Sequence, residues 1–253
     1  MLTRIDLRGQ PTADARSALP RAALDVAGAM AIVRPLCDDV RDRGAEAVRD
    51  ATARFDGVEV DELRVPAGLL RSALEALDGD VRAALEQAVQ RTRIVHEAQL
   101  PAMSATVEPA PGVRVTERWV PVDRVGLYVP GGKVAYPSSV VMNVVPAQVA
   151  GVRSMGVTSP PQPDHDGQPH PAVLAACALL GVDEVYRVGG AQAIAMLAYG
   201  ADGCAPVDVV TGPGNVYVAA AKRCVRGVVG VDAEAGPTEI AIVADDSADP
   251  AMV

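Results

Sequence analysis

The chain has no excess of positive charge and no long hydrophobic run. Its 253 residues include 23 Lys and Arg against 32 Asp and Glu, which gives a formal net charge of −9. Because a nucleic-acid backbone is bound by a basic surface, this balance argues against a nucleic-acid partner. The longest apolar stretch, 140–152, is interrupted by Asn143, Pro146 and Gln148 and is too short to span a bilayer, so no membrane partner is expected either.

The opening residues MLTRIDLRGQ lack the apolar core of a signal peptide. Cysteine is scarce in the chain. The four cysteines are widely spaced and form no CxxC pair: Cys37, Cys177, Cys204 and Cys224. This spacing argues against a zinc knuckle and a disulfide framework, and it fits a protein of the reducing cytoplasm. Cys177 and Cys224 stand in Ala-rich helical patterns, where we expect small buried hydrophobic residues rather than nucleophiles.

Histidine is scarcer still, with three residues in the chain. His96 lies in a helical pattern and is expected to have a structural role. His165 and His170 belong to the segment PDHDGQPH, which resembles a set of metal ligands, but the Pro and Gly around them favour a solvated connector. No Ser-His-Asp or Cys-His arrangement can be argued from the spacing.

The first hundred residues have the periodicity of helices. Helices are predicted over 32–55 with a break at Gly44, over 66–77, and from an N-cap at Asp78 or Asp80 to Pro101. In the first of these helices one face is apolar, formed by Ile32, Val33, Leu36, Val40, Val48, Ala51 and Phe55. The segment 103–121 reads as extended pieces joined by turns, which we interpret as a crossing into another domain.

From Arg124 onward, short apolar runs alternate with helical patterns. The predicted strands are 124–129, 153–159, 183–188, 207–212, 226–232 and 238–245. The predicted helices between them are 138–150, with Ser138 or Ser139 as the cap, 171–181, 191–200 and 215–225. Alternation of this kind builds a parallel sheet with helices on both faces, and such sheets bind ligands at the carboxyl ends of their strands.

Four glycine-bearing turns follow predicted strands. They are YVPGG at 128–132, VGGAQ at 188–192, TGPGN at 211–215 and EAGPT at 234–238. Glycine lets the backbone approach a ligand, and a helix that begins there offers free N–H groups to an anion. Tight turns need glycine in any case, but four of them at the same sheet edge predict a nucleotide site.

The third turn carries a partial dinucleotide fingerprint. Gly212 and Gly214 supply its GxG, but Tyr217 stands where a third glycine is usual, and Asp232 ends the following strand pattern. A GxG without the third glycine is a weak signal, since that glycine permits close helix packing.

Five polar residues beside these turns are candidates to contact a ligand: Tyr128, Lys133, Gln192, Asn215 and Thr238. Tyr128 has a ring that can pack on a base, and each amide offers a donor and an acceptor. A structural alternative stays open for three of them: Asn215 as a helix N-cap, Gln192 as a solvated side chain and Tyr128 as a core aromatic.

Five segments closely resemble histidinol dehydrogenase in their order and spacing: RVGLYVPGG, SSVVMNVVPAQVAGV, VGGAQAIA, TGPGNVYVAAAKR and DAEAGPTEIAIVAD. The helical region that ends in HEAQ at 96–99 is similar too. The resemblance implies an α/β, aldehyde-dehydrogenase-like fold with incomplete Rossmann-like parallel sheets, preceded by N-terminal helices. It divides the chain into 1–125, helices and the first part of domain 1; 126–238, a Rossmann-like NAD-binding domain; and 239–253, a strand returning to domain 1.

The same resemblance implies an activity. Histidinol dehydrogenases are cytoplasmic homodimers of histidine biosynthesis that oxidise L-histidinol through histidinal to L-histidine with two molecules of NAD. Zinc holds the substrate, and a Glu and a His handle water and protons. Carried over by motif, the NAD contacts fall on Tyr128, Gln192 and Asn215, and a substrate contact falls on Thr238. Thr replaces the familiar Ser there, which keeps the hydroxyl and adds a methyl group.

The family's zinc ligands and acid–base pair come after the position that matches Val253, so no catalytic or metal-binding residue is assigned in this chain. We expect the chain alone to bind NAD weakly and to have no turnover. Two alternatives stay open. One is a non-catalytic NAD-binding or assembly module that pairs with a separate zinc-bearing half. The other is an aldehyde dehydrogenase relative with a cysteine nucleophile, for which Cys204 is the loop candidate.

Overall fold

The computed structural model describes residues 5–8, 18, 25–131, 134–234, 242–249 and 251. Its centre is a sheet of five parallel strands: β3 (Arg124–Tyr128), β4 (Ser154–Ser159), β5 (Val185–Arg187), β6 (Val209–Thr211) and β7 (Gly230–Val231). The spatial order is β5-β4-β3-β6-β7, and every pair is parallel. The chain runs outward from β3 to β5 and then returns to β6 on the other side of β3. The strand order therefore reverses between β3 and β6, as in doubly wound nucleotide-binding folds.

Helices cover both faces of this sheet, as predicted. Helices α6 (Pro137–Val149) and α7 (Pro171–Leu179) connect β3, β4 and β5, and α8 (Gly190–Tyr199) and α9 (Val216–Val225) connect β5, β6 and β7. Right-handed crossovers that run in opposite directions place the two pairs on opposite faces. Strand β3 shows the division: Val125 and Leu127 join the core with α6 and α7, while Tyr128 joins the core with α8 and α9. The predicted α/β fold with a Rossmann-like sheet is confirmed.

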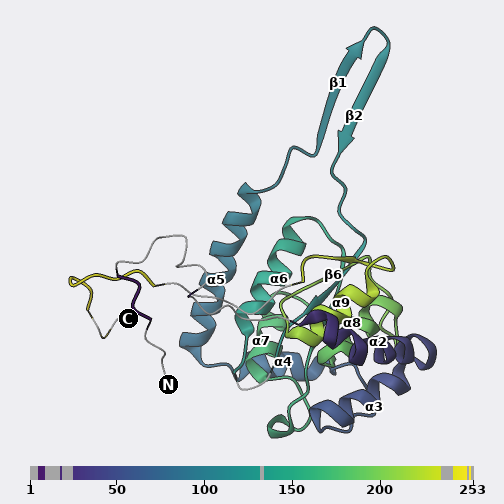
Figure 1. Ribbon diagram of the computed structural model, residues 1–253, viewed down its shortest axis with the longest axis vertical. Helices are drawn as coiled ribbons and strands as arrows, with labels where there is room; N and C mark the ends of the chain where they lie inside the picture. The colour runs from purple at the N-terminus through teal and green to yellow at the C-terminus, as the bar shows by residue number, and fades with distance from the viewer. Residues whose placement is uncertain are drawn as a thin grey trace.

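The N-terminal helices form an outer layer on each side (Figure 1). Helices α2 (Val26–Arg43) and α3 (Ala45–Asp56) pack on α8 and α9, and α4 (Ala67–Glu75) and α5 (Gly79–Ala98) pack on α7 and α6. Periodicity predicted three helices here, and the structure divides the first of them at Gly44 into α2 and α3. Of the two candidate caps for α5, the structure has Asp78, whose Oδ1 accepts from the backbone N–H groups of Asp80 and Val81.

Three local features differ from the pattern in the sequence. Ile32 and Phe55, on the predicted apolar face, do not join the core: they are 61% and 54% exposed, and the buried stripe of α2 runs through Val26, Ala29 and Val33. Helix α6 has no Ser cap and begins at Pro137, a residue whose fixed φ suits the first turn. The strand predicted over 226–232 is limited to β7, and no strand is assigned to 242–245, while 238–241 lie outside the described residues.

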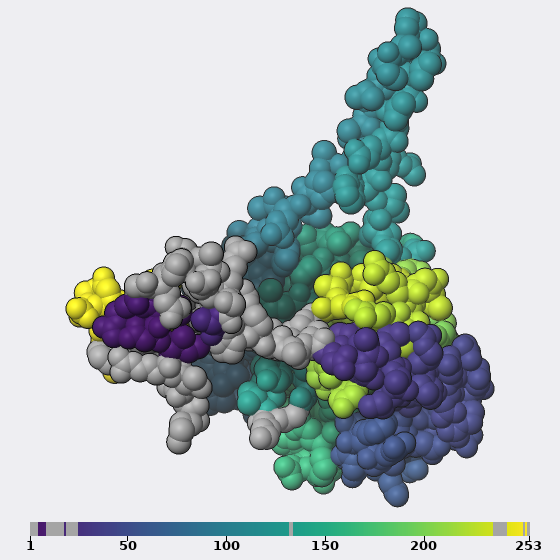
Figure 2. Space-filling model, viewed as in Figure 1, coloured from purple at the N-terminus to yellow at the C-terminus, as the bar shows by residue number. Residues whose placement is uncertain are grey.

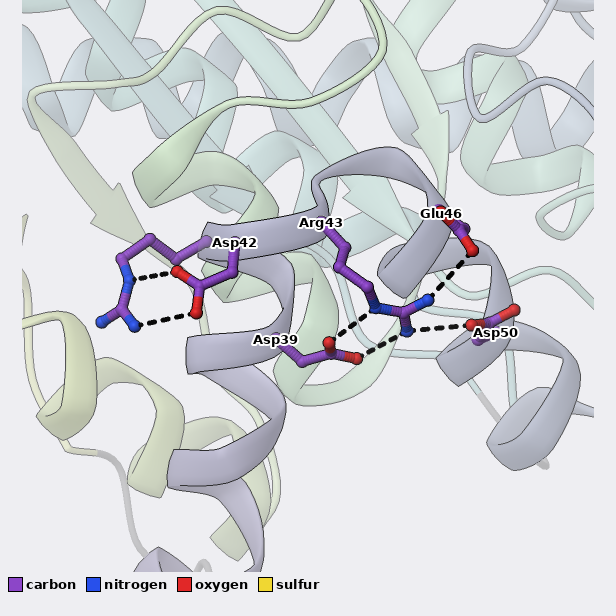
Figure 3. A network of polar contacts seen from close by, with 6 residues as sticks. Asp39, Asp42, Arg43, Glu46 and Asp50 are labelled. Carbon is purple, nitrogen blue, oxygen red and sulfur yellow. Dashed lines mark hydrogen bonds and ion pairs between the residues drawn. The ribbon is translucent and has the colours of Figure 1, made fainter.

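A charge network spans the corner between α2 and α3. The chain turns at Gly44, whose φ of 61° ends α2 while its N–H still donates to the Val40 carbonyl. Arg43 then donates to Asp39 of α2 and to Glu46 and Asp50 of α3 (Figure 3). One guanidinium thus connects the two helices on either side of the turn.

The extended segment predicted over 103–121 is an antiparallel hairpin, β1 (Ser104–Ala110) and β2 (Val113–Arg118). All its strand residues are exposed, including Val107 at 61% and Val115 at 54%, which face each other in the register. Figures 1 and 2 show it projecting away from the α/β body with no other part of the chain along its sides. In the part of the chain that the structure describes, no helix has the length and apolarity needed to cross a membrane.

Candidate functional site

A cavity of about 630 Å³ opens at the carboxyl edge of the sheet, beside the point where the strand order reverses. Its walls come from the segments that follow β3, β4, β5 and β6, and from α2 and α3 of the outer layer. The cavity brings together three of the five candidate residues, Tyr128, Gln192 and Asn215. Lys133 and Thr238, together with most of the turn at 234–238, lie outside the described residues.

Tyr128 is both a core aromatic and a wall of the cavity. It is 4% exposed, and its hydroxyl accepts a hydrogen bond of 3.2 Å from the backbone N–H of Gly190. Burial and, to a smaller extent, the charge of Asp56 raise the pKa of the phenol to about 12, against the lowering effect of the Gly190 N–H. The neutral phenol therefore connects the end of β3 to the first turn of α8.

Gln192 lies in that first turn of α8, and the solvated alternative for it is wrong. Its side chain is only 2% exposed, and Nε2 donates to Oδ2 of Asp56 at 3.3 Å. A buried amide that lines a cavity and makes one long hydrogen bond retains donor and acceptor capacity for a ligand.

Asn215 is the N-cap of α9, which confirms that alternative. Its Oδ1 accepts from the backbone N–H groups of Tyr217 at 3.0 Å and Val218 at 3.1 Å. The cap occupies the oxygen and leaves the NH₂ group as a donor on the cavity wall. The first turns of α8 and α9 thus both meet the cavity, and helix starts favour anions.

The glycine at 212 is required by the close approach of two strand ends. Gly212 has a φ of 118°, and a Cβ there would stand 2.1 Å from the Tyr128 carbonyl oxygen. Its N–H donates to Asp232 at 3.0 Å, and its carbonyl accepts from Lys222 Nζ at 2.5 Å. Lys222 also donates to Asp232 Oδ1 at 2.5 Å. Asp232, which the partial fingerprint placed at a strand end, therefore holds the turn itself.

The sequence pattern gave no indication of Asp56, which also lines the cavity. It is the last residue of α3, and burial raises the pKa of its carboxyl group to about 6 from an ordinary 3.8. The residues that surround it come from segments distant in sequence, so no local motif marks it. Its neighbour Phe55, from the predicted apolar face, also lines the cavity.

The histidines have structural positions. His170 is the N-cap of α7, and its Nδ1 accepts from the Ala172 N–H at 3.1 Å, while the ring of His165 packs edge-on at 4.8 Å. Across the described ranges, no group of three or more His, Cys, Asp or Glu is placed to hold a metal. The donor set described here therefore does not fit a zinc ion.

Cys204 does not have the surroundings of a nucleophile. It is 3% exposed, and burial raises the pKa of its thiol. A raised pKa disfavours the thiolate that attacks a carbonyl carbon.

The sheet order, the glycine turns and the cavity at the carboxyl edge define an α/β protein of the Rossmann-like class. A family model described as histidinol dehydrogenase matches residues 19–253. Histidinol dehydrogenase of Thermobifida fusca (strain YX) is 65% identical over 253 residues, which are 100% of this chain and 57% of that protein. The enzyme of Streptomyces avermitilis is 59% identical over 256 residues, with 100% of this chain and 58% of that protein covered.

A solved structure gives the same result. The crystal structure of histidinol dehydrogenase from Elizabethkingia anophelis matches with a TM-score of 0.84 and 28% sequence identity, over 95% of this chain and 55% of that one. The chain belongs to the histidinol dehydrogenase family, and it spans little more than half the length of these relatives.

Proposed function

We propose that this chain provides the NAD-binding part of an NAD-dependent L-histidinol dehydrogenase, which oxidises L-histidinol through histidinal to L-histidine in histidine biosynthesis. The observation that supports this most directly is the cavity that Tyr128, Gln192 and Asn215 share at the reversal of the strand order. Ligands of doubly wound sheets bind in that position.

The residues present fit a dinucleotide. The starts of α8 and α9 offer partial positive charge to the pyrophosphate, which is useful because the described residues that line the cavity include no Lys or Arg. Phe55 and Ile32 form an exposed apolar rim on which a base can pack. The NH₂ group of Asn215 and the amide of Gln192 can orient the cofactor, which accepts the hydride when it is bound.

Zinc and the acid–base pair are not assigned to residues of this chain. The resemblance implies a zinc ion, but the described donors do not form a site for it, so we expect its ligands beyond position 253. Thr238 stays the predicted contact to L-histidinol. On this proposal the 253-residue chain binds NAD without turnover, and the full-length protein acts in the cytoplasm.

We also propose that the full-length protein is a homodimer. The β1–β2 hairpin supports this, because an isolated two-stranded hairpin has little stability of its own in water. Its Val107, Val113 and Val115 are between 49% and 61% exposed, and Trp119 at its base is 55% exposed. A second copy of the chain would cover this apolar surface.

The activity can be tested in the full-length protein with L-histidinol and zinc by following NADH formation. We expect two NADH per histidinol, and we expect Asn215→Ala to raise the KM for NAD by about tenfold with little change in the KM for histidinol. Gln87→Ala, a change on the exposed side of α5, is the control. Absence of histidinol-dependent NADH formation contradicts the proposal, and it favours the alternative of a non-catalytic module if NAD still binds.

A further inference from the structure

The cavity contains a carboxylate to which no motif assigns a role. Oδ2 of Asp56 accepts the 3.3 Å bond from Gln192, and within the ranges that the structure describes Oδ1 accepts no hydrogen bond from a side chain or backbone group. Among the lining residues that the structure describes there is no cation to pair with it, and the second carboxylate on the wall, Asp164, is exposed. Asp56 is therefore a half-buried acceptor whose hydrogen-bonding capacity is mostly unused.

The place of Asp56 indicates which half of a dinucleotide it would meet. Gln192, its partner, follows β5, and the neighbouring wall 160–164 follows β4. These strands lie on the β3–β4–β5 side of the reversal, which in Rossmann-like sheets carries the adenosine half. In those folds an acidic residue at the end of the second strand binds the adenosine ribose. Here β4 is the second strand, and it is followed by Pro160 and Pro161, which have no carboxylate.

We propose that Asp56, presented from α3, accepts the 2′- and 3′-hydroxyls of the adenosine ribose and thereby makes the site select NAD over NADP. This inference rests on the proposed NAD site. Two adjacent hydroxyls can donate to the two oxygens of one carboxylate, and hydrogen bonds to a charged acceptor are stronger than neutral ones. A 2′-phosphate would instead bring two negative charges against Asp56, where the described lining offers no Lys or Arg, so binding of NADP is weakened.

The geometry also explains why the carboxylate is held by the outer helices. Arg43 connects α2 to α3, and α3 ends at Asp56. The Gln192 amide then orients the carboxylate from the opposite wall. Asp56 thus belongs to the cavity wall that the outer helices form, and not to the wall formed by the Rossmann-like sheet and its own helices.

The experiment is a calorimetric titration of the 253-residue chain with NAD and with NADP. We expect the wild type to prefer NAD by at least about tenfold, as one or two charge-assisted hydrogen bonds provide. Asp56→Asn should bind NAD about tenfold more weakly and NADP more tightly than the wild type does, so that the preference is lost. Asp61→Asn, which removes an exposed carboxylate five residues further along the chain, should keep the wild-type preference.

Each outcome is decisive. If the wild type binds neither nucleotide, the proposed NAD site itself is wrong. If the wild type prefers NAD and Asp56→Asn keeps that preference, the NAD site stands and the role of Asp56 is overturned. The role of Asp56 is also overturned if Asp164→Asn abolishes the preference for NAD and Asp56→Asn does not. Thermal unfolding followed by circular dichroism verifies that each variant is folded.

Discussion

Replacing Asp56 by Asn should stabilise the fold at alkaline pH. The folded-state pKa of about 6 stands above the ordinary 3.8, and at about 1.4 kcal/mol per pH unit the gap corresponds to roughly 3 kcal/mol. Solvent reaches this half-buried carboxylate and screens its charge, so we expect about 1–2 kcal/mol in practice. The uncharged groups that contact or adjoin it are Gln192 and the Tyr128 phenol, and the nearest other acid on the cavity wall is Asp164.

The direction follows from proton binding. The unfolded chain loses the Asp56 proton at a lower pH than the folded chain does, so the folded state loses stability as the pH rises from about 4 to about 6 and does not recover it above that. Asn has no such proton. Asp56→Asn should therefore unfold at a higher urea concentration than the wild type at about pH 8 and at nearly the same concentration at about pH 4. A variant that is less stable at about pH 8 would refute the reasoning, and Asp61→Asn should show no pH-dependent gain.

Three further substitutions test the turns and the thiol. Gly212→Ala should lower the free energy of unfolding by about 3 kcal/mol or more, because the new Cβ meets the Tyr128 carbonyl. Gly203→Ala, also at positive φ but with open space around it, should lower it by about 1 kcal/mol in the same urea unfolding assay. Equal losses would contradict the close approach at Gly212. Lys222→Met should cost about 2–4 kcal/mol by the same assay, since it removes a buried partner of the Gly212 carbonyl, and a neutral result would count against that network. Cys204→Ala in the full-length protein should leave histidinol oxidation unchanged. A variant without histidinol oxidation would instead support Cys204 as a nucleophile.

The sheet could be predicted from the sequence because its signals are local. The apolar runs of β3, β4 and β5 alternate with helical patterns, and the glycine turns mark where strands end. Tyr128, Gln192 and Asn215 could be named for the same reason, since each stands beside one of those turns. The N-cap role of Asn215 depends on residues only two and three positions away.

What the sequence could not predict depends on contacts between distant segments. Asp56 meets Gln192 across 136 positions, and nothing near Asp56 indicates a cavity. Lys222 stands in the last turn of α9, where periodicity and charge suggest a solvated cation at a helix C-terminus, yet it is 1% exposed and bound to the Gly212 turn. Periodicity also failed for Ile32 and Phe55, because an apolar side chain on a cavity rim has the same spacing as one in the core.

The most direct test of an NAD site in this chain is a calorimetric titration of the 253 residues with NAD, repeated with Gln192→Ala. We expect saturable one-site binding by the wild type, at least about tenfold weaker binding by Gln192→Ala because the buried amide is lost from the wall, and unchanged binding by Gln87→Ala. Absence of NAD binding up to millimolar concentration, or equal affinity in Gln192→Ala, would contradict it.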